Sequence, residues 1–278
     1  MSYLAKATKA TPKAPVITIV GFPGAGKTSL AGTFPNPIFI QAETASTVFE
    51  NAPEEKQPAF FPELPAAKKE KQVKPSEIIL AQLRELATAE HDFKTVVFDT
   101  VTTMNGLLES EVVEYDDNNP DNIADAAGGF HKGYLVSAGL HADIRRACEH
   151  LRKQGMTIIF LAHTGIAKMK NRPDSGSEYT AYTVDMPEKS RGFYVNHSDA
   201  VLYLKSEEHV MGGQENRKGQ TTKYARVTNT GERVLITSSD GTIGYIDAKN
   251  RYGMPSEIAV TQGENPIMQY IPFFNTEQ

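Results

Sequence analysis

The residues from Gly21 to Thr28, GFPGAGKT, have the spacing of a loop that binds nucleotide phosphates, G-x-x-x-x-G-K-[ST]. Its glycines let the backbone turn so that N–H groups point at phosphate oxygens. Lys27 is expected to reach the β- and γ-phosphates, and the Thr28 hydroxyl to bind Mg²⁺. A glycine-rich turn with an unrelated lysine is the alternative. The expected nucleotide-binding residues are Gly21, Pro23, Gly24, Ala25, Gly26, Lys27, Thr28 and Ser29.

Three more polar residues stand at the ends of apolar runs. Asp99 closes TVVFD, where a carboxylate could be the second protein partner of Mg²⁺. Glu43 follows PIFI and could act as a general base, and His163 closes IIFLAH and could contact the γ-phosphate. Each residue has a structural alternative: an Asp that caps the next turn, a solvated loop Glu, and a hydrogen-bonded His at the edge of the core.

These side chains need a scaffold, and the apolar pattern predicts a parallel sheet. VITIV, from Val16 to Val20, is rich in β-branched residues, as in a strand buried on both faces. Further apolar runs follow at 37–40, 95–99 and 157–163, with helical material between them. Strands that alternate with helices form a parallel sheet through right-handed crossovers.

Two segments between these runs have the periodicity of helices that lie on a sheet. Their apolar stripes consist of Ile79, Leu83 and Leu86, and of Leu140, Ile144, Cys148 and Leu151. After Asp199 the pattern changes to the short strands AVLYL, KYARV and RVLIT, without helices between them. The sequence therefore predicts an α/β fold: a mostly parallel central sheet flanked by helices, with an antiparallel C-terminal extension of the same sheet.

The predicted organisation is one ATPase domain at 15–260, between a flexible tail at 1–14 and a C-terminal tail at 261–278. Three segments, 51–74, 111–129 and 164–189, lack clear periodicity. Loops of this length in a compact domain are usually functional or disordered.

The chain has 278 residues, of which 40% are hydrophobic and 23% charged, and a formal net charge of -5. This acidic balance argues against a generally basic coat on nucleic acid, so a DNA site has to be a local basic patch. The N-terminus does not resemble a signal peptide and no run reaches 18 apolar residues, so a cytoplasmic protein without a membrane partner is expected. Cys148 is the only cysteine, which excludes internal disulfides and cysteine-based zinc sites.

The order of these motifs resembles that of RecA-type P-loop ATPases, and it implies a RecA-like core with ATP and Mg²⁺. FIQAE is similar to the FIDAE segment of recombinases, whose glutamate is the catalytic base, so the resemblance gives Glu43 that role. Gln41 replaces the aspartate of that segment. His163 stands where recombinases usually carry a glutamine that couples the γ-phosphate to the DNA-binding loop.

Near the end of the chain, KNRYG is similar to the KNRFG motif of RadA-type proteins and to the Lys-x-Arg pair of ring helicases. The resemblance implies that Lys249 and Arg251 reach the ATP of a neighbouring subunit, where cations stabilise transition-state charge. A solvated loop with two positive charges is the alternative. Size and motif order look most like the phage-encoded RecA-core annealing ATPases, the Sak-four group, which implies a homo-oligomeric ring or filament in the cytoplasm of a bacterial host.

The segment 164–189 is the candidate for binding single-stranded DNA. It offers cations for phosphates and aromatic rings for base stacking: Lys168, Lys170, Arg172, Tyr179 and Tyr182. The alternative is a solvated loop whose tyrosines pack on the sheet edge. The segment 111–129 carries acidic residues that would repel DNA, namely Glu114, Asp116, Asp117 and Asp121. The lysines at 68, 69, 71 and 74 are expected in a solvated linker.

Two functional classes follow from these features. The first is a DNA-stimulated ATPase that promotes annealing or strand exchange, with ATP at subunit interfaces and a single-strand-binding protein as a partner. The second is a regulatory or assembly ATPase in which nucleotide controls binding to a protein and DNA plays no part. The third class is a helicase-type motor. It is less favoured because no separate ring-forming domain is recognised in the sequence.

Overall fold

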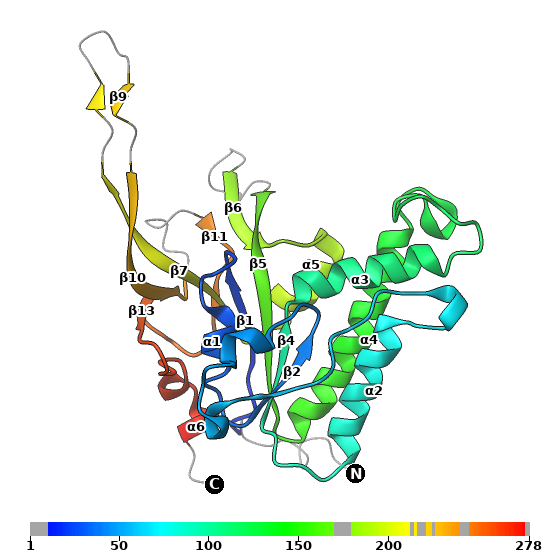
Figure 1. The fold of residues 1–278 in the computed structure, drawn as a ribbon, viewed down its shortest axis with the longest axis horizontal. Helices are drawn as coiled ribbons and strands as arrows, with labels where there is room; N and C mark the ends of the chain where they lie inside the picture. The colour runs from blue at the N-terminus through cyan, green and yellow to red at the C-terminus, as the bar shows by residue number, and fades with distance from the viewer. Residues whose placement is uncertain are drawn as a thin grey trace, which may run out of the picture.

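The computed structural model describes residues 11–169, 179–211, 214–215, 221–223, 226–238 and 245–275. A central sheet separates two layers (Figure 1). Helices α2 (Pro75–Thr88), α3 (Val101–Glu114), α4 (Gly133–Lys153) and α5 (Glu188–Val195) cover one face, while α1 (Lys27–Ala31) and α6 (Pro272–Asn275) lie on the other. Within the described ranges, no helix is both long and apolar enough to span a membrane.

The sheet places its strands in the order β13-β10-β7-β1-β5-β4-β2-β3. The parallel part consists of β1 (Val16–Gly21), β2 (Pro37–Gln41), β3 (Ala59–Phe60), β4 (Thr95–Asp99), β5 (Thr157–Met169) and β7 (Ala200–Met211). On β7, β10 (Arg226–Ile236) and then β13 (Glu257–Val260) continue the sheet in antiparallel fashion. The predicted fold class is therefore confirmed, with antiparallel strands at its C-terminal side. The run AVLYL, which was assigned to the antiparallel extension, is instead part of β7 and pairs parallel with β1.

The apolar stripes predicted from periodicity lie in the core. Ile79 and Leu83 of α2 and Ile144 and Cys148 of α4 are at most 1% exposed and pack against the same face of the sheet. Cys148 is a packing residue, as its position on a helix face suggested. The strand run at 16–20 is buried along its whole length because helices cover both faces.

The prediction of a loop at 164–189 is wrong for residues 164–169 and 179–184, which are strands, and for the last two residues, which begin α5. The strand β5 continues past His163 to Met169 and pairs antiparallel with β6 (Tyr179–Val184), from Thr164 opposite Val184 onwards. The segment lacks a long apolar run, so its strands were missed in the sequence, although Ala181, Thr183 and Val184 of β6 are buried. Lys170 and Arg172 lie outside the described residues.

Two other segments expected to be irregular pack against each other. α3 runs to Glu114, and the buried Glu111 carboxylate accepts a 2.8 Å hydrogen bond from the Ser76 backbone N–H at the start of α2. The lysine-rich segment is not a free linker, because Lys69 forms a 2.8 Å ion pair with Asp117. The Lys74 ammonium also lies 4.9 Å from the centre of the Tyr115 ring. Part of the acidic charge of 111–129 is thus compensated within the chain.

Residues 261–275, expected as a tail, pack on the α1 face of the sheet. Ile267 and Ile271 are fully buried there, close to Leu30 of α1. The remaining short elements are η2 (Ser46–Phe49), η3 (Glu54–Lys56), η4 (Lys69–Lys71), η5 (Ala126–Gly128), η6 (Met268–Tyr270), β8 (Gln214–Glu215), β9 (Thr221–Lys223), β11 (Tyr245–Ile246) and β12 (Lys249–Asn250).

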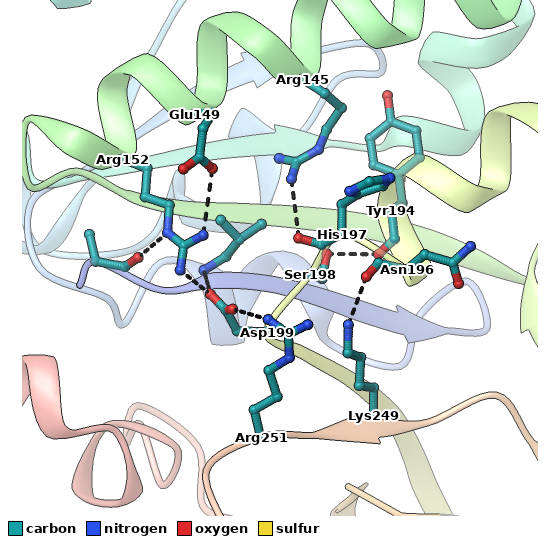
Figure 2. Close-up of polar contacts among 12 residues, drawn as sticks. Arg145, Glu149, Arg152, Tyr194, Asn196, His197, Ser198, Asp199, Lys249 and Arg251 are labelled. Atoms are coloured by element: carbon teal, nitrogen blue, oxygen red, sulfur yellow. Dashed lines mark hydrogen bonds and ion pairs between the residues drawn. The ribbon is translucent and has the colours of Figure 1, made fainter. Parts of the chain in front are cut away.

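The amino edge of the sheet, where the parallel strands begin, is organised around the buried carboxylate of Asp199 (Figure 2). One oxygen accepts hydrogen bonds from the Val16 backbone N–H at 3.1 Å and from Arg152 at 2.7 Å, and the other accepts from Arg251 at 3.0 Å. Asp199 therefore fixes the start of β1 next to the start of β7. The Arg152 side chain is 18% exposed, whereas that of Arg251 is 58% exposed.

We expect Asp199→Ala to lower the free energy of unfolding by about 3 kcal/mol or more, because it removes the carboxylate partner of the largely buried Arg152, which keeps only Ala14 and Glu149 as acceptors among the described residues, and leaves the Val16 backbone N–H without its acceptor. Arg251→Ala should lower it by less than about 1 kcal/mol, because it removes only the solvent-exposed partner. Urea unfolding of both variants, followed by circular dichroism, measures the difference. Equal losses in the two variants would contradict this division.

Candidate active site

The loop after β1 turns tightly over the sheet because two glycines occupy positions where a side chain would not fit. A Cβ atom on Gly21 would lie 2.6 Å from the Leu204 carbonyl oxygen of β7, and Gly26 has a φ of 93°. The Lys27 ammonium donates hydrogen bonds to the carbonyl oxygens of Gly21 (3.0 Å) and Phe22 (3.1 Å). Burial lowers the pKa of Lys27, while Asp99 and Glu43 act in the opposite direction. The lysine is thus held inside the loop by two of its three N–H groups, and neither of these two hydrogen bonds uses the third.

Thr28 and Asp99 meet at the carboxyl edge of the sheet, where the parallel strands end. The Thr28 hydroxyl donates a 2.7 Å hydrogen bond to the Asp99 carboxylate. Asp99 is 2% exposed, and burial raises its pKa to about 6, partly offset by the bond from Thr28. A buried carboxylate beside a hydroxyl suits Mg²⁺, which prefers oxygen ligands and completes its shell with substrate phosphates. Within the described residues, no group of three or more His, Cys, Asp or Glu side chains could hold a metal on its own.

Glu43 lies beside His163 across the same edge. Its carboxylate is 3.5 Å from His163 Nε2 and accepts a 3.1 Å hydrogen bond from the Thr103 hydroxyl. The contact with His163 is the main cause of a lowered pKa of Glu43, which keeps this carboxylate ionised at neutral pH. An ionised carboxylate at this position can accept a proton from water.

Gln41 supports the loop that carries Glu43. Its side-chain amide donates to the Phe61 carbonyl at 2.8 Å and accepts from the backbone N–H groups of Ala45 (3.1 Å) and Ser46 (3.3 Å). An amide can donate and accept at once, whereas an ionised aspartate could only accept. The replacement seen at this position in the sequence therefore has a local structural reason.

His163 links the site to the hairpin of β5 and β6. Its backbone N–H donates to the Thr102 hydroxyl at 3.0 Å, and its Nδ1 is buried without a hydrogen-bond partner among the described residues. Thr102 and Thr103 lie shortly after Asp99, with Thr100 and Val101 between, and sequence reasoning missed both. Their only signal was a run of hydroxyl side chains after a strand-ending carboxylate.

The residues predicted to bind DNA are only partly placed. Lys168 is exposed on β5, beyond His163. Tyr182 packs against the phosphate loop: its ring centre is 6.2 Å from that of Phe22 and 6.0 Å from that of Tyr203. This packing matches the alternative in which a tyrosine lies on the sheet edge, although 39% of Tyr182 remains exposed. Tyr179 begins β6, opposite Met169.

Lys249 and Arg251 do not join the phosphate loop of their own chain. The Lys249 ammonium donates to the Asn196 carbonyl at 2.8 Å, and Arg251 binds Asp199 (Figure 2). Both lie at the amino edge, and the six residues of β1 separate this edge from the loop by about 16 Å. Any contact of these cations with ATP therefore requires a second protomer.

The comparisons with known proteins agree with this arrangement at the level of the family. A family model described as an AAA domain matches residues 13–252, which is most of the chain and includes every residue of the site described above. No curated protein matches the chain. The chain therefore belongs to this AAA domain family, AAA_24, a family of P-loop ATPases.

Proposed function

We propose that the protein is a Mg²⁺-dependent ATPase of DNA recombination that binds single-stranded DNA and promotes annealing or strand exchange as a homo-oligomer. The observation that carries the proposal is the continuity of β5. This one strand holds His163 against Glu43 and then forms the hairpin that presents Lys168. We name annealing or strand exchange as the reaction because the chain resembles phage annealing ATPases. The same resemblance suggests a single-strand-binding protein as a partner.

The hydrolysis step follows from the residues at the carboxyl edge. Lys27 and the loop N–H groups bind the phosphates of ATP, and Thr28 with Asp99 would hold Mg²⁺, which neutralises phosphate charge when bound. Glu43 accepts a proton from the water whose oxygen attacks the γ-phosphorus. The bond from that phosphorus to the bridging oxygen of ADP breaks, and the electron pair leaves with ADP.

Two contacts would transmit the nucleotide state to the hairpin. His163 contacts Glu43 from one side, and a γ-phosphate beside it would compete for that histidine. Tyr182 of β6 rests on Phe22, which belongs to the phosphate loop itself. A change at either contact alters the hairpin, so ATP and DNA affinities should be linked reciprocally.

The acidic segment is a weaker argument against DNA than its composition suggested. Lys69 pairs with Asp117, and the Asp116 carboxylate accepts hydrogen bonds from the backbone N–H groups of Asn118 and Ala127. One observation favours the second candidate, a partner-controlled assembly ATPase. Ile166 is 70% exposed on the same strand as Lys168, and a large exposed apolar side chain suits a protein partner.

We expect single-stranded DNA to stimulate ATP hydrolysis at low salt, with weaker stimulation at physiological salt because phosphate contacts release counterions. Lys168→Ala should raise the DNA concentration needed for half-maximal stimulation by a factor of about 2 to 5, while Lys153→Ala, an equal charge change at the amino edge, should not. Steady-state hydrolysis with and without DNA measures both. Hydrolysis indifferent to DNA at every salt concentration would exclude the recombination role and leave the assembly ATPase.

Glu43→Gln should retain ATP binding and lower turnover by about 100-fold or more, because the amide cannot take the proton from water. Fluorescent-nucleotide binding and single-turnover hydrolysis separate the two effects. The control is Glu63→Gln, which alters an exposed carboxylate that accepts a hydrogen bond from Thr44. Turnover like that of the unmodified protein in Glu43→Gln would remove the general-base role.

Arg251→Ala and Lys27→Ala proteins should each be nearly inactive, and mixing them should restore part of the activity. In a head-to-tail assembly, some interfaces of the mixture combine an intact phosphate loop with an intact Arg251 from the neighbour. Hydrolysis measured across mixing ratios, with size-exclusion chromatography to verify assembly, tests this. Assembled mixtures that stay inactive at all ratios would contradict action in trans.

A further inference from the structure

A cation that the sequence did not single out lies against the phosphate loop of the same protomer. A Cβ atom built on Gly26 would lie 2.3 Å from an Nη atom of Arg233 and 2.7 Å from its Cζ. The guanidinium group therefore rests directly on the Gly26 backbone, one residue before Lys27. Arg233 belongs to β10, far along the chain from the loop.

The register of the antiparallel extension explains this position. Arg233 pairs with Ser206 of β7, just beyond Leu204, which pairs with Gly21 at the start of the loop. Side chains two residues apart on a strand share a face. Leu235 is buried with the α1 residues on one face of the sheet, so Arg233 projects from that same face, at the level of the phosphate loop.

The charge of Arg233 has no carboxylate partner within the part of the chain that the structure describes, although the side chain is half-buried. Arg152 and Arg251, by contrast, are both bound to Asp199. A partly buried guanidinium favours a bound anion, and its planar fork suits phosphate oxygens. The anion that the adjacent loop is built to hold is the phosphate chain of a nucleotide.

We propose that Arg233 is a phosphate-binding residue that contacts the nucleotide in cis, from its own protomer. This inference rests on the proposed ATP site and adds a second cation to Lys27. The two arginines then have different roles: Arg233 contacts the nucleotide bound to its own chain, whereas Arg251 can contact only the nucleotide bound to a neighbouring chain.

The test is equilibrium binding of ATP, ADP and inorganic tripolyphosphate to the full chain and to Arg233→Met. We expect affinities for ATP and tripolyphosphate to fall by about 10- to 100-fold, the factor for loss of a charge-assisted hydrogen bond. Arg233→Lys should recover part of the loss because it keeps the charge. Lys205→Met is the matched control: it removes a cation of the neighbouring strand, paired with Val234 and so on the opposite face, and should bind as the unmodified chain does.

Each outcome decides the inference. Unchanged tripolyphosphate binding in Arg233→Met would overturn it, and loss of ATP binding alone would assign Arg233 to the nucleoside instead. If Arg233→Met does not fold by circular dichroism, Arg233→Gln, which keeps a polar side chain, takes its place. Failure of the unmodified chain to bind ATP would overturn the proposed function as well, which distinguishes that failure from a fault in this inference.

A second assay separates cis from trans. At an ATP concentration that saturates only the unmodified protein, mixtures of Arg233→Met with Lys27→Ala should show no more activity than the two variants give separately, because both changes damage the same site of their own protomer. Recovery of activity in these mixtures would show that Arg233 acts on a neighbour and would overturn the assignment in cis.

Discussion

The hydrogen bond between Thr28 and Asp99 depends on an arrangement of strands that determines the whole site. Thr28 follows β1 and Asp99 ends β4, and these strands are not neighbours because β5 lies between them. Two strand spacings, about 10 Å, separate their backbones, so the two side chains must meet across β5. The residue of β5 at this level is His163, which pairs with Gly21 at the end of β1. The strand order therefore brings together the phosphate loop, the Asp99 carboxylate and His163. Burial of Asp99 follows from the same geometry and raises its pKa to about 6. A carboxyl group with a raised pKa destabilises the ligand-free fold increasingly as the pH rises from 3.8, its ordinary pKa, to about 6, and by the full amount above that, so a bound cation relieves the charge at neutral pH.

The two edges of the sheet carry different chemistry, and β1 connects them. Its carboxyl end opens into the phosphate loop, and its amino end is tied through Val16 to Asp199 and hence to Arg251. Such polarity suits a head-to-tail contact, in which one surface meets a different surface of the next subunit and the assembly grows as a ring or filament. Asp199 holds the start of β1 while also orienting an exposed arginine toward solvent. Stability and the proposed role in trans are thereby joined in one carboxylate.

Local pattern was sufficient for the features that depend on burial. The run at 16–20, the stripe of Ile79 and Leu83, and the phosphate loop were all readable, because buried strands, amphipathic helices and tight glycine turns each leave a periodic or compositional mark. The failures have a common physical cause. The hairpin beyond His163 is formed by backbone pairing of β5 with β6. The lysine-rich segment is held by a hydrogen bond from the Lys69 backbone N–H to Glu114 and by an ion pair between Lys69 and Asp117, both more than 40 positions further along the chain. Neither arrangement depends on apolar periodicity. The position of Arg233 beside the phosphate loop was not predicted for a related reason. It follows from the register of an antiparallel strand pair and not from neighbours in the sequence.

The antiparallel extension then has a role beyond covering the edge of the sheet. From Ala200 the chain runs up β7 past the phosphate loop, returns along β10 with Arg233 at the level of that loop, and reaches the amino edge at Lys249 and Arg251. The segment from β7 to β12 thus places Arg233 near the carboxyl edge of the sheet, and Lys249 and Arg251 at or next to its amino edge. Because β7 is the hydrogen-bonded neighbour of β1, a shift of β7 would move the phosphate loop at Gly21 and also Asp199 at the opposite end of the strand. Under the proposed function, this pair of strands would relate the nucleotide bound by one subunit to the arginine that it offers to the next.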